Sequence, residues 1–279
     1  GKPGRIDGGG AITNCLFLFS FLLFLNRFPT QGINSFTLFI AAVAVIAFFS
    51  FLTIEKRANS PLINLELFHN LSFSLANLCA LLNFMSQYIL VTLTPSYLNR
   101  VLQYEQNEVG LLLTIFPLTT LAVAPLAGSL SDRISPRFLS FTGATLCALS
   151  LFSLSKLPTA IGTAGVAWRL ALFGLGTGIF QSPNMNIAMG SAPQEHLGVA
   201  SSILATVRNI GMVLGTALGG GILSVSVPSS ILQGLGRLAG EEASIFMLGL
   251  KNAYLWGAIL TGMAALISLF TIHHGSIKS

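Results

Sequence analysis

Charged side chains are scarce in this sequence. Only 8% of its 279 residues are charged and 53% are hydrophobic, whereas roughly a quarter of the residues of a typical soluble protein are charged. Because so few charges cannot cover the surface of a globule in water, the composition excludes a soluble domain. The mean hydropathy of +0.77 predicts an all-α, polytopic bundle of membrane helices instead.

The motifs of common enzymes are also missing. The sequence contains no GxSxG element, no HExxH helix and no Walker-type glycine loop, which argues against a hydrolase, a metalloprotease and an ATPase. The three cysteines lie far apart in apolar runs and form no CxxC pair, so they predict neither a disulfide framework nor a metal site. We therefore expect no enzymatic activity, no metal and no cofactor.

Basic residues outnumber acidic ones by 14 to 9, but they lie singly or in pairs between apolar runs. This spacing argues against a nucleic-acid partner. It is typical of the charges that orient membrane spans, and the count of Lys and Arg on the two sides slightly favours a cytoplasmic start. The expected location is the cell membrane, as a multi-pass protein in the lipid bilayer.

Eight apolar runs are long enough to cross a bilayer as helices. None shows the ten-residue alternation of a membrane barrel. Short polar loops connect them, and the longest late loop, 226–247, is expected to hold Glu241 and Glu242. The predicted spans are 8–25, 35–54, 72–93, 109–130, 138–154, 164–188, 198–225 and 252–272.

The loop after the fourth span packs a carboxylate and two cations into a tight turn. It reads Gly128-Ser-Leu-Ser-Asp132-Arg133-Ile-Ser-Pro-Arg137. Asp132 can accept hydrogen bonds from the N-terminus of a neighbouring helix, and the arginines can bridge to carbonyl groups or acids on adjacent helices. The loop is either a conformational switch or a solvated, positively charged turn.

Arg208 is the most unusual residue of the predicted spans. It lies about 15 Å along a helix that starts near Gly198, so it is expected close to the middle of the membrane. Since an intramembrane Arg is costly, it needs a partner or a watery cavity. No Asp or Glu lies inside a predicted span, which leaves carbonyl groups, Gln181, Asn184, a bound anion or another part of the protein. A purely structural Arg is the alternative.

The third span carries a polar face. Asn83 and Gln87 are four residues apart, with the aromatic Tyr88 beside them. Amides that faced lipid would be costly, so we expect them to face the bundle interior. They form either a substrate cavity, to which Phe116 of the fourth span adds, or a clamp between helices.

Glycines at four-residue spacing mark two helix faces. Such a face lets another helix backbone approach closely. It serves either simple packing or a seam that slides during a conformational change. The glycines concerned are Gly174 and Gly178 in the sixth span and Gly211, Gly215 and Gly219 in the seventh.

The loop that contains Asp132 resembles the cytoplasmic signature G-x-L-x-D-R-x-G-R-[KR] of the major facilitator superfamily. The chain departs from the signature at Ser135 and Pro136. Three further segments resemble the fourteen-span drug:proton antiporters of the EmrB/QacA type: 61–68, 174–184 and 198–217. The resemblance covers nearly the whole chain.

This resemblance implies that the chain is the last eight spans of fourteen. Residues 1–54 would be two extra central spans, 55–71 a cytoplasmic loop and 72–279 the six-span C-terminal half. The N-terminal half of the same protein would be missing. The chain begins with Gly rather than Met, which fits that expectation.

The implied function is secondary active transport by alternating access, as proton-coupled export of hydrophobic or cationic small molecules. Because no acid lies inside a span, the coupling carboxylates would belong to the missing half. We therefore expect that residues 1–279 alone do not transport. The alternative is a non-transporting scaffold or a permease subunit of a larger complex.

Overall fold

The computed structural model describes residues 34–55, 65–131, 133–158, 161–234 and 236–271, together with short stretches between 12 and 24. Every regular element in these ranges is helical, so the predicted all-α membrane bundle is confirmed. Six helices are long and apolar enough to cross a membrane. They are α3 (Leu71–Ser96), α4 (Gln106–Ser131), α5 (Pro136–Ser155), α6 (Thr163–Gly190), α7 (Leu197–Ser226) and α9 (Gly240–Ser268).

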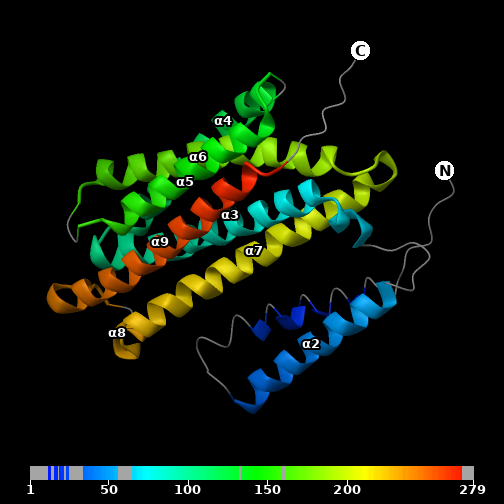
Figure 1. Ribbon diagram of the computed structural model, residues 1–279. Helices are drawn as coiled ribbons and strands as arrows, with labels where there is room; N and C mark the ends of the chain where they lie inside the picture. Colours follow the sequence, from blue (N-terminus) through cyan, green and yellow to red (C-terminus); the bar gives the residue numbers. More distant parts are fainter. Residues whose placement is uncertain are drawn as a thin grey trace.

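Helix α2 (Ser35–Glu55) precedes this bundle and matches the second predicted span within one residue. It is apolar on all sides and lies apart from the other long helices, below α7 in Figure 1. A helix that is hydrophobic all round is typical of a membrane span. The first predicted span, 8–25, falls only in part within the described residues, where its described stretches are helical.

Short elements connect the long helices. They are η1 (Leu65–His69), η2 (Tyr97–Val101), η3 (Gln194–His196) and α8 (Ser229–Gln233). The side chain of Asn70 caps α3 by accepting hydrogen bonds from the backbone N–H groups of Ser72 and Phe73. Pro136 is the first residue of α5, a position that proline favours because its missing N–H would be unpaired there anyway. The departure from the family signature at this residue therefore starts a helix.

The last span was predicted wrongly. Helix α9 begins at Gly240, twelve residues before the predicted start, and Glu241 and Glu242 lie in its first turn instead of in a loop. Hydropathy located only the apolar part of this helix. The two acids remain helical because negative side chains are stabilised by the partial positive charge of a helix N-terminus.

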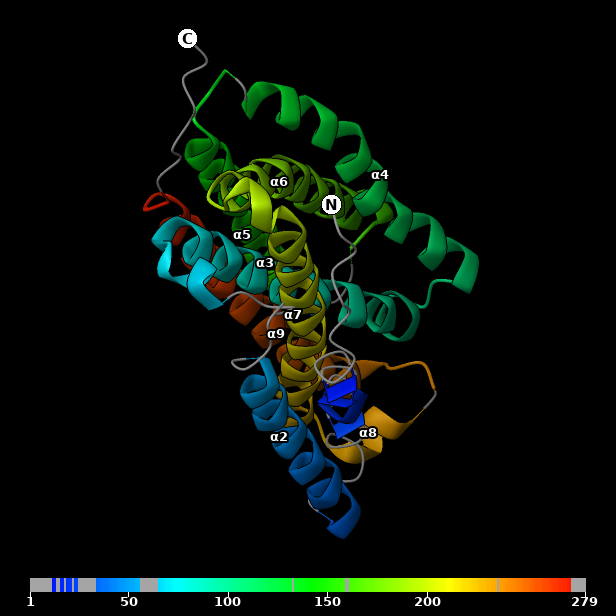
Figure 2. The same cartoon turned by 90° about the vertical axis from the view of Figure 1, so that its right-hand side faces the viewer.

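The long helices of the bundle pack on one another in pairs. Helix α3 packs on α7 and α9, α5 packs on α6 and α9, and α4 packs on α6. Figure 2 shows α4 at one edge of the stack and α7 across it. Little of the apolar stretch is buried in α4 (11%) and α7 (17%), compared with half in α3, α5 and α9. The outward faces of α4 and α7 are therefore the least covered surfaces of the bundle.

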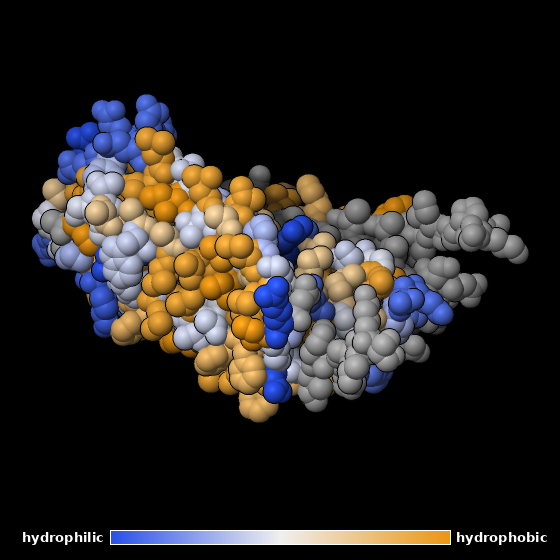
Figure 3. Space-filling model, turned by 90° about the horizontal axis from the view of Figure 1, so that it is seen from above, coloured by the Kyte–Doolittle hydropathy of each residue, from blue (hydrophilic) through white to orange (hydrophobic). Residues whose placement is uncertain are grey.

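The main core lies where α3, α5, α6 and α9 meet. A hydrogen bond of 2.8 Å joins the hydroxyl groups of Thr94 and Tyr254 inside it. On the face of the bundle seen in Figure 3, apolar side chains cover much of the middle, and hydrophilic side chains gather at the end away from the grey segments. This distribution is the one expected of a protein whose middle faces lipid.

Candidate functional site

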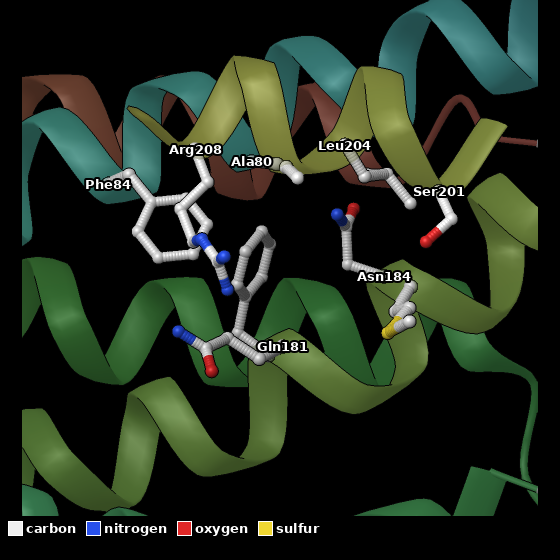
Figure 4. Close-up of a pocket in the computed structure, with 10 residues that line it drawn as sticks. Ala80, Phe84, Gln181, Asn184, Ser201, Leu204 and Arg208 are labelled. Atoms are coloured by element: carbon white, nitrogen blue, oxygen red, sulfur yellow. The ribbon is translucent and has the colours of Figure 1, made fainter. Parts of the chain in front are cut away.

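A pocket of about 240 Å³ opens between α3, α6 and α7. Helices α6 and α7 make few direct contacts, and both pack on α3. This arrangement leaves a space between α6 and α7, and side chains of all three helices point into it (Figure 4). The lining residues are Ala80, Phe84, Phe180, Gln181, Asn184, Met185, Ser201, Leu204, Ala205 and Arg208.

Among the described residues that line this pocket, Arg208 is the only charged one. It lies close to the middle of the 33-residue span Gln194–Ser226, roughly 16 Å from the start of α7. Its guanidinium group points from α7 across the pocket toward Gln181 (Figure 4). A cation thus lies near the middle of an apolar span, in an open space between three helices.

Asn184 is almost fully buried, with 3% of its surface exposed. Its amide nitrogen donates a hydrogen bond of 3.0 Å to the carbonyl oxygen of Ala76. Its amide oxygen has no hydrogen-bond partner. A buried acceptor without a partner is costly, so a donor that reached this oxygen from the pocket would stabilise it.

Helix α7 packs closely on α3 beside the pocket. A Cβ atom at Gly211 would stand 2.8 Å from Cβ of Phe84 and 3.0 Å from the carbonyl oxygen of Leu81. One turn further along α7, Gly215 lies against the backbone of Met85, and Gly219 lies beside Ile89. The three glycines of the seventh span therefore all face α3.

The glycines of the sixth span face a different helix. A Cβ atom at Gly174 would stand 2.5 Å from the carbonyl oxygen of Phe116, and one at Gly178 would stand 3.0 Å from Cβ of Val123. Both contacts are with α4. The phenyl ring of Phe116 itself packs on Phe173, with 5.5 Å between ring centroids.

Four predicted cavity residues, Asn83, Gln87, Tyr88 and Phe116, do not line this pocket. The side chain of Asn83 is fully buried, and neither of its amide atoms has a hydrogen-bond partner. Because Ala80 and Phe84 share one face of α3, the amides at 83 and 87 lie on a neighbouring face. Of the seven residues predicted to line a cavity, only Gln181, Asn184 and Arg208 line this pocket.

The predicted switch loop is described only in part, since Asp132 lies outside the described residues. The backbone N–H of Arg133 donates to the carbonyl oxygen of Leu130 at 3.0 Å and closes a turn after α4. The guanidinium carbon of Arg137 lies 4.9 Å from the centre of the Phe138 ring. Gly128 lies close to α6, where a Cβ atom would stand 3.0 Å from the hydroxyl oxygen of Ser182.

Sequence reasoning missed a second contact between α4 and α6 beside this loop. The amide nitrogen of Asn186 donates a hydrogen bond of 2.8 Å to the hydroxyl oxygen of Ser131, the last residue of α4. It also missed the meeting of Gly143 and Gly176, where α5 and α6 touch backbone to backbone. The run of alternate glycines at 174, 176 and 178 is a signal that both faces of α6 are closely packed.

The apolar lining residues of the pocket were missed as well. Phe84, Phe180 and Leu204 carry no signal of their own in a chain this rich in hydrophobic residues. Within the described ranges, no three His, Cys, Asp or Glu side chains are grouped closely enough to hold a metal ion.

Comparison with known proteins shows what the chain is similar to. The model of the Major Facilitator Superfamily matches residues 76–273. The "Uncharacterized transporter YebQ" of Escherichia coli (strain K12) is 36% identical over 219 residues, which cover 78% of this chain and 47% of that protein. The "Riboflavin transporter RibZ" of Clostridioides difficile (strain 630) is 30% identical over 64% of this chain and 40% of its own length.

The "Quinolone resistance protein NorB" of Staphylococcus aureus (strain MW2) is 28% identical over 79% of this chain and 48% of its own length. The chain thus spans less than half the length of these relatives. A solved bacterial homolog of the human lysosomal transporter Spinster, inward-facing and unoccupied, superposes with a TM-score of 0.55 at 16% identity, covering 95% of this chain and 67% of that one. This chain belongs to the Major Facilitator Superfamily of transporters and is a multi-pass protein of the cell membrane.

Proposed function

We propose that this chain takes part in proton-coupled export of hydrophobic small molecules, as part of a secondary active transporter that works by alternating access. The pocket between α3, α6 and α7 carries the proposal. Apolar walls with a few convergent polar groups are typical of small-molecule sites. An ionisable residue inside a membrane span, such as Arg208, marks a functional site by default.

The chain is proposed to supply the last eight spans of a fourteen-span antiporter of the EmrB/QacA type. Residues 1–54 are then the two extra central spans, 55–71 a cytoplasmic loop and 72–279 the C-terminal half. The greater length of the relatives supports this division. The poorly covered faces of α4 and α7 support it too, because an N-terminal half would cover them.

The proton-coupling groups are proposed to lie in that other half. The acids in the described ranges lie at helix ends or in a short connecting helix: Glu55 at the end of α2, Glu66 in η1, Glu105 and Glu108 at the start of α4, Glu195 before α7, and Glu241 and Glu242 in the first turn of α9. A coupling carboxylate must instead be reached in turn from each side of the membrane. None of these seven occupies such a position.

The breadth of cargo among relatives supports export of hydrophobic compounds. Relatives carry the names "Quinolone resistance protein NorB" and "Multidrug resistance protein Stp", the latter from Mycobacterium tuberculosis. Of the two cargo classes that the sequence suggested, hydrophobic molecules suit the pocket better than cations, since Arg208 would repel a cation. Family membership also favours a transporter over a scaffold or a permease subunit.

Efflux from cells that express the native protein tests this proposal. Cells are loaded with the uncharged dye Nile red or with cationic ethidium, energised, and followed by fluorescence with and without a protonophore. We expect protonophore-sensitive efflux of Nile red that exceeds the efflux of ethidium. The matched control is Arg237→Gln, which removes an exposed charge outside the pocket and should leave efflux unchanged. Efflux equal to that of cells without the protein would contradict the proposal.

A further inference from the structure

We infer that the pocket between α3, α6 and α7 recognises aromatic carboxylates that also carry an N–H or O–H donor. This inference rests on the proposed function and names the substrate class of the same site. Its basis is the combination of three features in one pocket: a lone cation, a buried acceptor without a partner, and aromatic walls.

The cation selects for an anion. Arg208 is exposed to the pocket, and within the described part of the chain no group accepts a hydrogen bond from its guanidinium. The nine other side chains that line the pocket are neutral. A guanidinium offers five N–H donors in a planar fork that matches a carboxylate with two parallel hydrogen bonds. A carboxylate on the ligand therefore supplies a counter-charge that the described lining of the pocket lacks.

The unpartnered acceptor selects for a donor. The amide nitrogen of Asn184 is held by the carbonyl oxygen of Ala76 at 3.0 Å, which fixes the orientation of the amide. Its oxygen has no hydrogen-bond partner among the described residues, and only 3% of the surface of Asn184 is exposed. A site with a buried unpaired acceptor discriminates against ligands that lack the matching donor.

The remaining walls select for a flat apolar body. Phe84 projects from α3 toward Arg208 (Figure 4), and Phe180 and Leu204 also line the pocket. A volume of about 240 Å³ is small for a drug-sized site and suits one fused ring system with a short acidic arm. Aromatic rings also stack favourably on such walls.

Four related indoles test the three features separately. Indole-3-acetate has the carboxylate, the ring N–H and the aromatic body. Indole-3-acetamide lacks the charge, tryptamine carries a cation in its place, and 1-methylindole-3-acetate lacks the ring N–H. Binding of each compound to the purified native protein in lipid nanodiscs is measured by equilibrium dialysis. We expect indole-3-acetate to bind at least tenfold more tightly than the amide and the N-methyl compound, with tryptamine weakest.

Two substitutions assign these preferences to residues. Arg208→Gln should bring the acid and the amide to within twofold of each other, while Arg208→Lys should keep part of the difference. Asn184→Leu should remove the preference for the ring N–H and leave the acid-to-amide ratio unchanged. Lys156→Gln, which removes an exposed charge at the end of α5, is the control and should change neither ratio. Because the readout is a ratio between probes, a moderate loss of folded protein does not affect it.

Equal affinity for acid and amide in the native protein would overturn the inference, as would tighter binding of tryptamine. An equal loss of affinity for both probes in Arg208→Gln would also overturn it, because Arg208 would then act by pairing with another part of the protein. If Nile red is exported but indole-3-acetate and indole-3-acetamide bind equally well, the inference fails and the proposed export stands. Selective binding of acids without any protonophore-sensitive efflux defeats the proposed export and leaves the inference standing.

Discussion

Gly215 of α7 lies directly against the backbone carbonyl group of Met85 in α3, so closely that a Cβ atom would overlap the carbonyl oxygen. One turn on either side, Gly211 and Gly219 face the same helix. The close approach depends on the absence of side chains along this face of α7. The pocket that Arg208 lines lies beside this close approach, since Phe84, which Gly211 contacts, also lines the pocket.

Gly215→Ala should destabilise the protein because α7 would have to move away from α3. Forcing an extra carbon into a packed interface costs on the order of 1–3 kcal/mol. The matched control is Gly221→Ala on the same helix, where a Cβ atom meets nothing within 4 Å. Since Ala favours helices over Gly, the control should be neutral or slightly stabilising. Thermal unfolding in detergent measures the stability of both variants. Equal melting temperatures would contradict the claim that the contact between α7 and α3 requires glycine at position 215.

Asp132→Asn should impair transport without loss of folded protein. In the proposed switch the charge of Asp132 holds one conformation, and the substitution removes this charge but keeps the shape of the side chain. Efflux and membrane abundance are measured together in the native protein. Ser129→Ala is the control, because its hydroxyl group bonds only to the carbonyl oxygen of Leu126 in its own helix. Normal efflux by Asp132→Asn at normal abundance would make the loop a solvated turn.

Arg100→Met should loosen the connection between α7 and α9. The Arg100 side chain donates hydrogen bonds to the carbonyl oxygens of Ile231 and Gly236, the latter at 3.3 Å. Loss of these bonds at a partly exposed site should cost about 1 kcal/mol. Hydrogen exchange over 227–239 should become faster, whereas Arg237→Met, at an exposed position, should not change it. Unchanged exchange in Arg100→Met would show that the connection is held by other contacts.

Residues 1–279 alone should not transport. The described acids lie at helix ends or in a short connecting helix, and the sequence contains no other acid inside a predicted span. A proton-coupled carrier needs a titratable group that is reached from both sides. Proteoliposomes that contain only this chain should therefore show no dye movement under an imposed pH gradient. Gradient-driven, saturable uptake in these vesicles would mean that coupling resides in residues not identified here.

The positions of most spans could be predicted from the sequence. The residues of the candidate site could be predicted only in part. Helix α7 begins and ends within one residue of its prediction, because a 30-residue apolar run is a local property. The start of α9 was missed, because hydropathy does not register a helix that continues past the apolar region through Glu241 and Glu242. Gln181 and Asn184 were named from the sequence as possible partners of Arg208, and the structure places all three around one pocket; their role stays a prediction.

The sequence by itself determined that this is an all-helical membrane protein and where the apolar part of each described span runs. These properties depend on residues close together in the chain, through hydrophobicity, helix period and turn chemistry. Only the tertiary structure decided that Gly215 meets Met85, that Asn83 faces the packed core and that Asn184 and Arg208 face one space. The rotation of each helix about its axis is set by contacts with helices far away in the sequence, and the amino-acid order along one helix does not specify them.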